Sequence, residues 1–366
     1  MEKAKKPLWK RILKAIGILL LICVVAIGGL FAALFITEYN PEEEEPISAV
    51  GAASKTLTFG EDFSVLSWNI GYCGLGASED FFMDGGQNVF PSSKQAVLDN
   101  LNAVESYLQT QQPDVVFLQE VDQNATRTSY LNEVASLRSV LGSYASVFAN
   151  NFKVLFIPYP FPPMGHEDGG ILTFSKYDIA SSTRVQLPCP FSGIEKIGNL
   201  KRCLLVSRLP IEGSDRELVL INLHLEAYDS GEGKIAQTKM LVDVMNKEYE
   251  KGNYVIVGGD FNQVFDSVDD SMYPTITPDG WTPGEVDTAA FGDGWHFYMD
   301  STVPTCRSLN QPYIAGATPE EFQYYMIDGF IISGNILVES METKDLGFAN
   351  SDHNPIEITL MLSEPQ

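Results

Sequence analysis

The sequence is poor in basic residues. Its 366 residues hold 24 Lys and Arg against 48 Asp and Glu, a formal net charge of −24 at pH 7. Residues 1–14 contain six of the bases and one acid, so this stretch carries +5 and the remaining chain −29. An acidic body lacks the broad basic face that non-specific nucleic-acid binding requires. The charge therefore argues against a protein that coats DNA or RNA, but not against a nuclease with a local metal site.

Cysteine is also scarce. Cys23 lies in an apolar run, and Cys73, Cys189, Cys203 and Cys306 show neither CxxC nor zinc-type spacing. This excludes a disulfide framework for so long a chain and indicates no catalytic cysteine, while one or two disulfides among the last four stay open. With 45% hydrophobic and 20% charged residues, most of the chain cannot be disordered, and it contains no internal repeat.

One long apolar segment is present near the N-terminus. Residues 15–36 are uncharged, and at 1.5 Å rise per residue they span roughly 33 Å, enough for a hydrocarbon core of about 30 Å. A cleaved signal peptide is the alternative, but its apolar region usually has only about 7–15 residues. Bases precede the segment and glutamates follow it, which places the N-terminus in the cytoplasm. We predict a basic cytoplasmic tail (1–14), a transmembrane helix (15–36) and an extracytoplasmic body at the plasma membrane.

The body has many strand patterns and few helical ones. Residues 37–60, with prolines, a glutamate run and small residues, are typical of a linker. Beyond it, strands are predicted at 63–70, 115–120, 144–149, 171–175, 203–209, 218–225, 254–261, 326–333 and 356–362, and helices after Ser93 and over 232–249. Residues 263–310 predict a long surface insertion. The pattern favours one domain, an α/β sandwich of sheets covered by helices.

Polar residues stand where several of these strands end. They are Asn69, Glu120, His224, Asp260, Asn262, Asp328 and the pair Asp352-His353. Singly, each has a simpler interpretation as a turn or surface residue, and His224 as a core histidine. Rigid strands that end at one rim bring such side chains into a shared site. Together the set supplies the parts needed for metal-assisted attack of water on a phosphate ester.

A family resemblance follows from the order of these motifs. WN (68–69), QEVD (119–122), NLHLEA (222–227), GGDFN (258–262), MIDGFI (326–331) and SDHNP (351–355) together resemble the endonuclease/exonuclease/phosphatase superfamily over residues 61–362. The resemblance implies a four-layer α/β sandwich of two packed mixed sheets flanked by helices, with a divalent-metal site along one edge and hydrolysis of a phosphodiester or phosphomonoester as its activity.

The resemblance also implies a metal site. Glu120 would be the principal Mg²⁺ ligand, helped by Asn69 through its side-chain oxygen and by Asp352 directly or through water. Hard oxygen ligands leave Mn²⁺ or Ca²⁺ as alternatives.

The remaining motif residues receive catalytic roles from the same resemblance. Asp260 would orient and deprotonate the attacking water, and Asn262 would donate a hydrogen bond to the phosphate, which Asn69 also contacts. His353 would bind or protonate a phosphoryl oxygen with Asp328 on its other ring nitrogen, because a histidine that faces phosphate needs a partner to fix its tautomer and charge. His224 would interact with the leaving group or the phosphate.

Substrate identity stays open in the sequence. Arg127 and Arg202 could each bind an anionic group or be solvated loop residues. Residues 156–170 interleave aromatics and prolines, and they could face substrate or pack on the sheet. A lipid headgroup, a small phosphorylated molecule and nucleic acid are the candidate substrates, and no protein partner is predicted. A surface or Ca²⁺-binding module that keeps the fold without the chemistry is the alternative function.

Overall fold

Two mixed β-sheets pack against each other in the computed structural model, which describes residues 7–53, 55–277 and 280–365. The seven-stranded sheet has the order β1 (Glu44–Ile47), β6 (Ser181–Gln186), β7 (Cys203–Pro210), β8 (Glu217–His224), β9 (Tyr254–Asp260), β15 (Asp328–Ser333) and β12 (Trp295–Tyr298). The six-stranded sheet has the order β16 (Ile336–Thr343), β17 (Ile356–Leu362), β2 (Asp62–Asn69), β3 (Val115–Asp122), β5 (Gly165–Ser175) and β4 (Ala145–Ile157). Every predicted strand is present within these sheets.

Alternating side chains of the central strands fill two different cores. In β2, Phe63 and Val65 pack between the sheets, whereas Leu66 and Trp68 pack beneath helices on the outer face. Because successive residues of a strand point to opposite faces, a strand buried on both sides becomes a continuous apolar run. This explains why the central strands are the clearest strands in the sequence.

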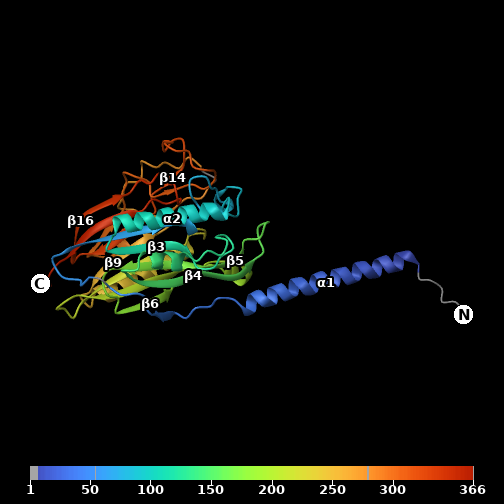
Figure 1. Cartoon of the computed structure of the whole chain (residues 1–366), viewed down its shortest axis with the longest axis horizontal. Helices are drawn as coiled ribbons and strands as arrows, with labels where there is room; N and C mark the ends of the chain where they lie inside the picture. The colour runs from blue at the N-terminus through green and yellow to red at the C-terminus, as the bar shows by residue number, and fades with distance from the viewer. Residues whose placement is uncertain (1–6, 54, 278–279, 366) are drawn as a thin grey trace.

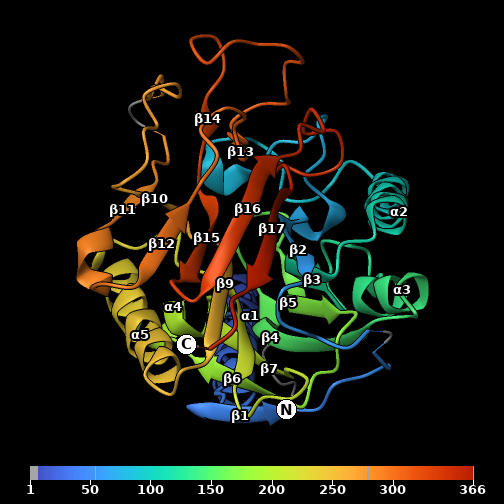
Figure 2. The same cartoon turned by 90° about the vertical axis from the view of Figure 1, so that its left-hand side faces the viewer.

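Helices cover the outer faces of the sheets. α2 (Lys94–Gln111) and α3 (Glu133–Val140) pack on the six-stranded sheet, and α5 (Glu232–Tyr249) packs on the seven-stranded sheet. Figure 2 shows these helices on either side of the two sheets. Ser93 accepts a hydrogen bond from the Ala96 backbone N–H at the start of α2, the N-cap that the sequence predicts. The predicted four-layer sandwich is confirmed.

The segment predicted as a linker is partly structured. Within residues 37–60, β1 pairs antiparallel with β6 and forms one edge of the seven-stranded sheet. Glutamates and a proline suit an edge strand, because one side of its backbone needs no partner. Composition does not separate such a strand from a linker.

The predicted insertion at 263–310 also contains regular structure. β12 extends the seven-stranded sheet, β10 (Gln263–Phe265) pairs with β11 (Gly284–Val286), and η3 covers Thr288–Phe291. β13 (Cys306–Arg307) pairs with β14 (Tyr324–Tyr325). These strands have two to four residues each, too few for a periodic pattern to show in the sequence.

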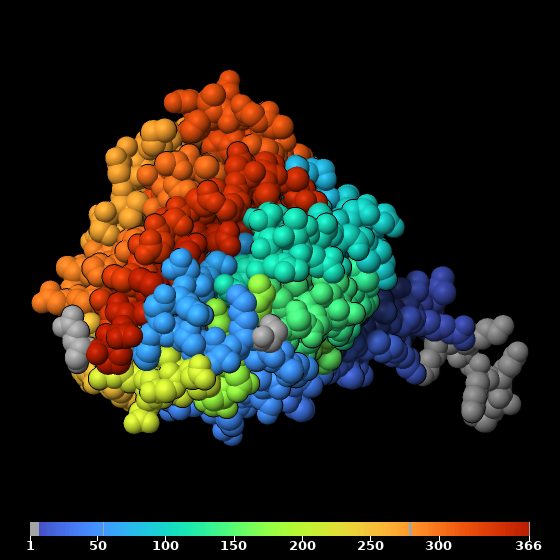
Figure 3. All heavy atoms as spheres, turned by 60° about the vertical axis from the view of Figure 1, so that its left-hand side comes forward, coloured from blue at the N-terminus to red at the C-terminus, as the bar shows by residue number. Residues whose placement is uncertain are grey.

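The helix α1 (Leu8–Ile36) leaves the body on the side of the β4–β5 hairpin (Figure 1) and projects from it in the space-filling view (Figure 3). It begins seven residues before the predicted span. Among the described residues it is the one helix long and apolar enough to cross a membrane, by length and composition. Of the predicted tail 1–14, residues 1–6 lie outside the described residues.

Glu248 near the end of α5 ties this helix to the seven-stranded sheet. It accepts hydrogen bonds from Arg208 on β7 (2.6 and 2.9 Å), from Lys251 (2.9 Å) and from Asn253 (3.0 Å). Burial alone would raise the pKa of Glu248, but these donors lower it to about 2. Its stabilising effect is therefore present above about pH 4.5, the unfolded pKa, and is lost as pH falls towards 2.

We expect Glu248→Gln to lower the free energy of unfolding by about 1–3 kcal/mol at pH 7, because charged hydrogen bonds are lost. The difference from the wild type should shrink below about pH 4. Chemical denaturation at several pH values measures it. The exposed neighbour Glu250 provides the matched variant Glu250→Gln, which should stay within about 0.5 kcal/mol of wild type. An equal loss in both variants would contradict the role of Glu248.

Candidate active site

Three neighbouring strands of the seven-stranded sheet bring polar side chains to one edge. His224 ends β8 and stands in register with Asp260, the last residue of the parallel strand β9. Asp328 begins β15 and pairs with Asp260 from the other side. Strand register thus places a histidine and two carboxylates side by side, as their positions at strand ends predict. The Nε2 atom of His224 lies 3.5 Å from Oδ2 of Asp260.

The six-stranded sheet contributes Asn69 and Glu120 to the same edge. The pairing of β3 with β5 shifts between Leu118 and Val121, and Glu120 there has a positive φ of 53°. Such a bulge turns a side chain away from the regular alternation. Asn262 (φ 52°) and Tyr72 (φ 41°) also have left-handed backbone conformations, and together with Glu120 they line one cavity of the structure. Backbone strain of this kind gathers at functional sites.

His353 is held by contacts on several sides. Its Nδ1 lies 2.8 Å from Oδ2 of Asp328, the pairing that the sequence predicts. Its backbone carbonyl accepts a hydrogen bond from Nε1 of Trp68 (2.9 Å), which gives the tryptophan of the WN motif a positioning role. Its Nε2 points to the carboxylates, 3.9 Å from Oδ2 of Asp260 and 4.0 Å from Oδ2 of Asp352.

The two histidines differ in charge. Burial opposes the imidazolium of His353, but the carboxylate of Asp328 raises its pKa well above the usual 6.5. Burial and then the Arg202 guanidinium lower the pKa of His224 well below that value. At neutral pH His353 is therefore cationic and His224 neutral. Facing one phosphate, the first can offset negative charge while the second exchanges a proton.

Comparisons with known proteins identify the family of this chain. The sequence model of the Endonuclease/Exonuclease/phosphatase family matches residues 66–309. The chain belongs to this family. Hydrolysis of phosphate esters, typically with a divalent metal, is the reaction of the family. No curated protein sequence matches the chain.

Solved structures of the family share the fold. The endonuclease/exonuclease/phosphatase from Beutenbergia cavernae is 18% identical with a TM-score of 0.56, over 82% of this chain and 72% of that one. The protein from Bacteroides vulgatus is 18% identical with a TM-score of 0.52, over 83% and 100%. Truncated Caenorhabditis elegans TDP2 is 18% identical with a TM-score of 0.51, over 83% and 98%. Identities this low establish the fold alone.

The side-chain amide of Asn69 contacts two of the predicted site residues. Its nitrogen donates to Oε1 of Glu120 and to Oδ2 of Asp260, both at 3.0 Å, while its oxygen accepts from the Gly71 backbone N–H at 3.0 Å. The oxygen thus faces the Gly71 backbone rather than the carboxylates, and the role of Asn69 as a metal ligand stays a prediction. Asn69 joins the predicted metal ligand to the predicted base.

The acidic residues of the family site fit a hard cation. Burial first, and then the Glu120 carboxylate, raise the pKa of Asp352 to about 6. Burial and the Asp328 carboxylate raise the pKa of Asp260. Like charges that face one another in a buried site favour a cation between them. Their carboxylate oxygens suit Mg²⁺, with Mn²⁺ and Ca²⁺ as alternatives. Among the described residues, two groups of three have donor atoms within 4.8 Å of one another, and Glu120 belongs to neither. The groups are Asp260/Asp328/His353 and Cys306/Asp352/His353.

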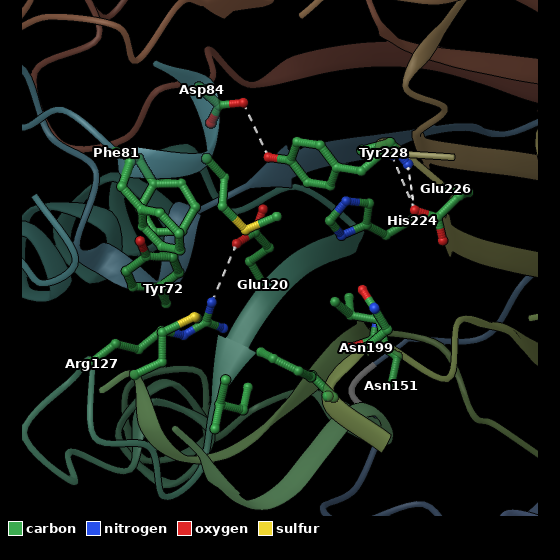
Figure 4. A pocket seen from close by; sticks show the side chains of 18 of the residues that line it. Tyr72, Phe81, Asp84, Glu120, Arg127, Asn151, Asn199, His224, Glu226 and Tyr228 are labelled. Carbon is green, nitrogen blue, oxygen red and sulfur yellow. Dashed lines mark hydrogen bonds and ion pairs between the residues drawn. The ribbon is translucent and has the colours of Figure 1, made fainter. Parts of the chain in front are cut away.

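Arg127 lines the cavity and is held in a buried ion network, and its predicted contact with substrate stays a prediction. Its Nε and Nη2 donate to Asp122 at 2.9 Å each, and Nε lies 3.2 Å from Glu167. The guanidinium stacks 3.8 Å from the Tyr72 ring, and Nη1 is 3.9 Å from Oε2 of Glu120 (Figure 4). Most of the N–H donors of Arg127 are thus engaged, and its guanidinium lies beside the Glu120 carboxylate and helps to hold it in place.

Arg202 is likewise buried rather than solvated. Its Nε lies 3.2 Å from Oε2 of Glu226, and Nη1 donates to the His224 carbonyl at 3.2 Å. It therefore fixes the backbone at the end of β8 and contributes to the neutral state of His224.

Several residues of the site have no signal in the sequence. Asp84 of η2 (Phe82–Asp84) lines the cavity, and the Tyr228 hydroxyl donates to its Oδ1 at 3.1 Å (Figure 4). Burial raises the pKa of Asp84 to about 7. Cys306 pairs with His353 through the backbone, and burial raises the pKa of its thiol to about 12, which disfavours the thiolate that a nucleophile needs. All five cysteines are described and none forms a disulfide.

These side chains share one cavity of about 560 Å³. Glu120, Asp260, Asp352, His224 and His353 all line it, as does Asn262, whose nitrogen donates to the Leu225 carbonyl at 2.9 Å. Figure 4 shows His224 and Glu120 directed into it from different strands. These six residues thus line one cavity that is large enough for a phosphate ester, while Asn69 and Asp328 contact them without lining it.

Proposed function

We propose that this chain is a divalent-metal-dependent phosphoesterase that hydrolyses a phosphodiester or phosphomonoester through a water activated by Asp260. The observation that carries the proposal is the convergence of His353, Asp260 and Glu120 on one cavity. The cationic histidine can offset charge on the phosphoryl oxygens, the buried carboxylate can activate water, and the second carboxylate can hold a metal ion.

The residues divide the chemistry among them. Asp260 orients a water and accepts its proton while the water oxygen bonds to phosphorus and one P–O ester bond breaks. His353, charged and held by Asp328, offsets the negative charge of the phosphoryl oxygens. Neutral His224, whose Nε2 lies 3.5 Å from Oδ2 of Asp260, accepts the proton that Asp260 takes from the water and passes it to the leaving oxygen. Asn262 donates a hydrogen bond to the phosphate.

Glu120 and Asp352 would hold the metal ion, Mg²⁺ in the first instance. When bound, the ion offsets charge that develops on the phosphoryl oxygens. Asn69 and Arg127 hold Glu120 in place through the contacts described above.

We further propose that α1 anchors the enzyme in the plasma membrane, with the N-terminus in the cytoplasm and residues 61–362 as an extracytoplasmic catalytic domain. The support is the length and apolarity of α1 and the bases that precede it.

Chelation tests the proposal. We expect the purified chain to hydrolyse bis(4-nitrophenyl) phosphate in the presence of Mg²⁺. Excess EDTA should lower the rate of this hydrolysis by about 100-fold or more, and addition of Mg²⁺ or Mn²⁺ should restore it. Glu120→Gln should raise the Mg²⁺ concentration needed for half-maximal rate by about 10-fold or more, whereas the exposed Glu61→Gln should not. Metal binding by calorimetry without any product would instead favour the Ca²⁺-binding module.

A further inference from the structure

The walls of the cavity differ in chemistry. Its polar end holds Glu120, Asp260 and His353. Other walls are apolar and come from α1, from η2 and from the β4–β5 hairpin, including Phe31, Leu34, Phe82, Val154, Phe156 and Tyr159. Phosphate needs only the polar end. The apolar walls therefore indicate a substrate that also has a large apolar part.

One of these walls is the end of α1 itself. Leu34 is only 4% exposed and Phe31 is half-buried, whereas most of the helix is exposed. Just beyond the helix, Glu38 lies 3.6 Å from Nζ of Lys201, which ties the end of α1 to the body. Phe31 stands five residues before the end of the helix at Ile36, roughly 8 Å at 1.5 Å per residue. With α1 in the membrane, the cavity lies at the depth of the lipid headgroups.

Exposed apolar side chains surround the same region. The β4–β5 hairpin carries Leu155 (46% exposed), Tyr159 (72%) and Phe161 (94%), and it reaches out on the side from which α1 leaves (Figure 1). Ile194 and Met83, also exposed, line the cavity from α4 (Gly193–Gly198) and η2. Clustered exposed apolar residues mark contact surfaces, and aromatic residues favour the membrane–water interface.

We propose that the cavity takes a phospholipid from the leaflet in which α1 ends. The phosphate meets Glu120, Asp260 and His353, the acyl-bearing part rests against Phe31 and the hairpin, and the exposed hairpin residues dip into the bilayer. This inference rests on the proposed phosphoesterase activity. Water adds to phosphorus, the P–O bond to one alcohol breaks, and the products are an alcohol and a phosphomonoester.

The charge of the chain favours a zwitterionic headgroup. Residues 15–366 carry −29, so an anionic leaflet would repel the body and a nucleic acid would bind it weakly. A zwitterionic phospholipid brings a phosphodiester without net negative charge. Phosphatidylcholine is therefore the substrate probe of choice.

The test compares two substrates on the same full-length chain, reconstituted in phosphatidylcholine vesicles with Mg²⁺. Phosphorus-31 NMR follows conversion of the lipid to a phosphomonoester, and absorbance follows bis(4-nitrophenyl) phosphate. We expect hydrolysis of both. The double variant Leu155→Ser/Phe161→Ser, at side chains outside the cavity lining, should lose at least 10-fold on the lipid and stay within twofold on the soluble diester.

Leu337→Ser is the matched control, because Leu337 is 47% exposed on β16, on the side of the body away from α1 (Figure 1). It should keep both activities. Hydrolysis of the soluble diester without any lipid product would overturn the lipid inference and leave the phosphoesterase proposal standing. Hydrolysis of neither substrate would overturn both. An unchanged lipid rate in the hairpin variant, or an equal loss in Leu337→Ser, would overturn the role of the exposed hairpin.

Discussion

Asp260→Asn is expected to lower kcat/KM for bis(4-nitrophenyl) phosphate by about 10²–10⁴-fold, the range that a positioned general base contributes. Oδ2 of Asp260 accepts from the Asn69 amide at 3.0 Å and lies 3.5 Å from Nε2 of His224, while Oδ1 accepts from the Asn262 backbone N–H at 2.9 Å. Asparagine keeps the size of the side chain but cannot take a proton from water. The loss should therefore appear in kcat rather than in KM.

The matched control is Asp243→Asn on the outer face of α5, where the carboxylate is exposed. It should keep the wild-type rate. Thermal unfolding of both variants shows whether the fold is intact, since the buried Asp260 contacts three strands. A folded Asp260→Asn enzyme with more than a tenth of the wild-type kcat would remove Asp260 from the role of base.

The sequence predicts which residues form the candidate site better than it predicts how their side chains are arranged. Residues such as His224 and Asp260 are identifiable because they end apolar strands, and two parallel neighbours with aligned ends must bring them together. Asp328 could be predicted for the same reason, since a strand that starts at that edge adds a third side chain. Two things place these residues together: their position at strand ends and the register of the strands. The position at strand ends can be identified in the sequence.

Other features depend on contacts between distant segments. The bulge at Glu120 follows from how β3 pairs with β5, and the orientation of the Asn69 amide follows from the Gly71 backbone N–H. Arg127 contacts Glu167, which is 40 residues away in the sequence. Because the local sequence does not show this partner, it cannot distinguish a buried arginine from an exposed one. Asp84 reaches the cavity from an irregular segment that has no periodicity to interpret.

Two further elements, β1 and the end of α1, cannot be recognised from the sequence pattern alone. β1 pairs on one side only, so its Glu-Glu-Pro-Ile sequence needs no apolar alternation. The contact of α1 with the cavity is another case, because Phe31 and Leu34 do not differ from the other apolar residues of a membrane-type helix. Only the folded chain shows that one face of that helix is a wall of the site.

The second large effect concerns the pair His353 and Asp328. His353→Gln should lower kcat/KM by about 10²–10³-fold, because a buried cation that faces the phosphoryl oxygens is lost. Asp328→Asn should lower kcat/KM by about 10–100-fold, since Asp328 does not face the phosphate but orients the imidazole through the 2.8 Å contact to Nδ1 and keeps it charged. Steady-state kinetics on the soluble diester measure both.

The double variant decides whether the two residues act as one unit. If Asp328 works through His353, then removing it when the imidazole is already absent has nothing further to disturb, and the double variant should equal His353→Gln alone. The neighbouring carboxylate of Asp260, 3.9 Å from Nε2 of His353, is present in all three variants and keeps the rest of the site comparable. Additive losses would mean that Asp328 contributes to catalysis by a separate route, through Asp260 to which it is paired across β9 and β15.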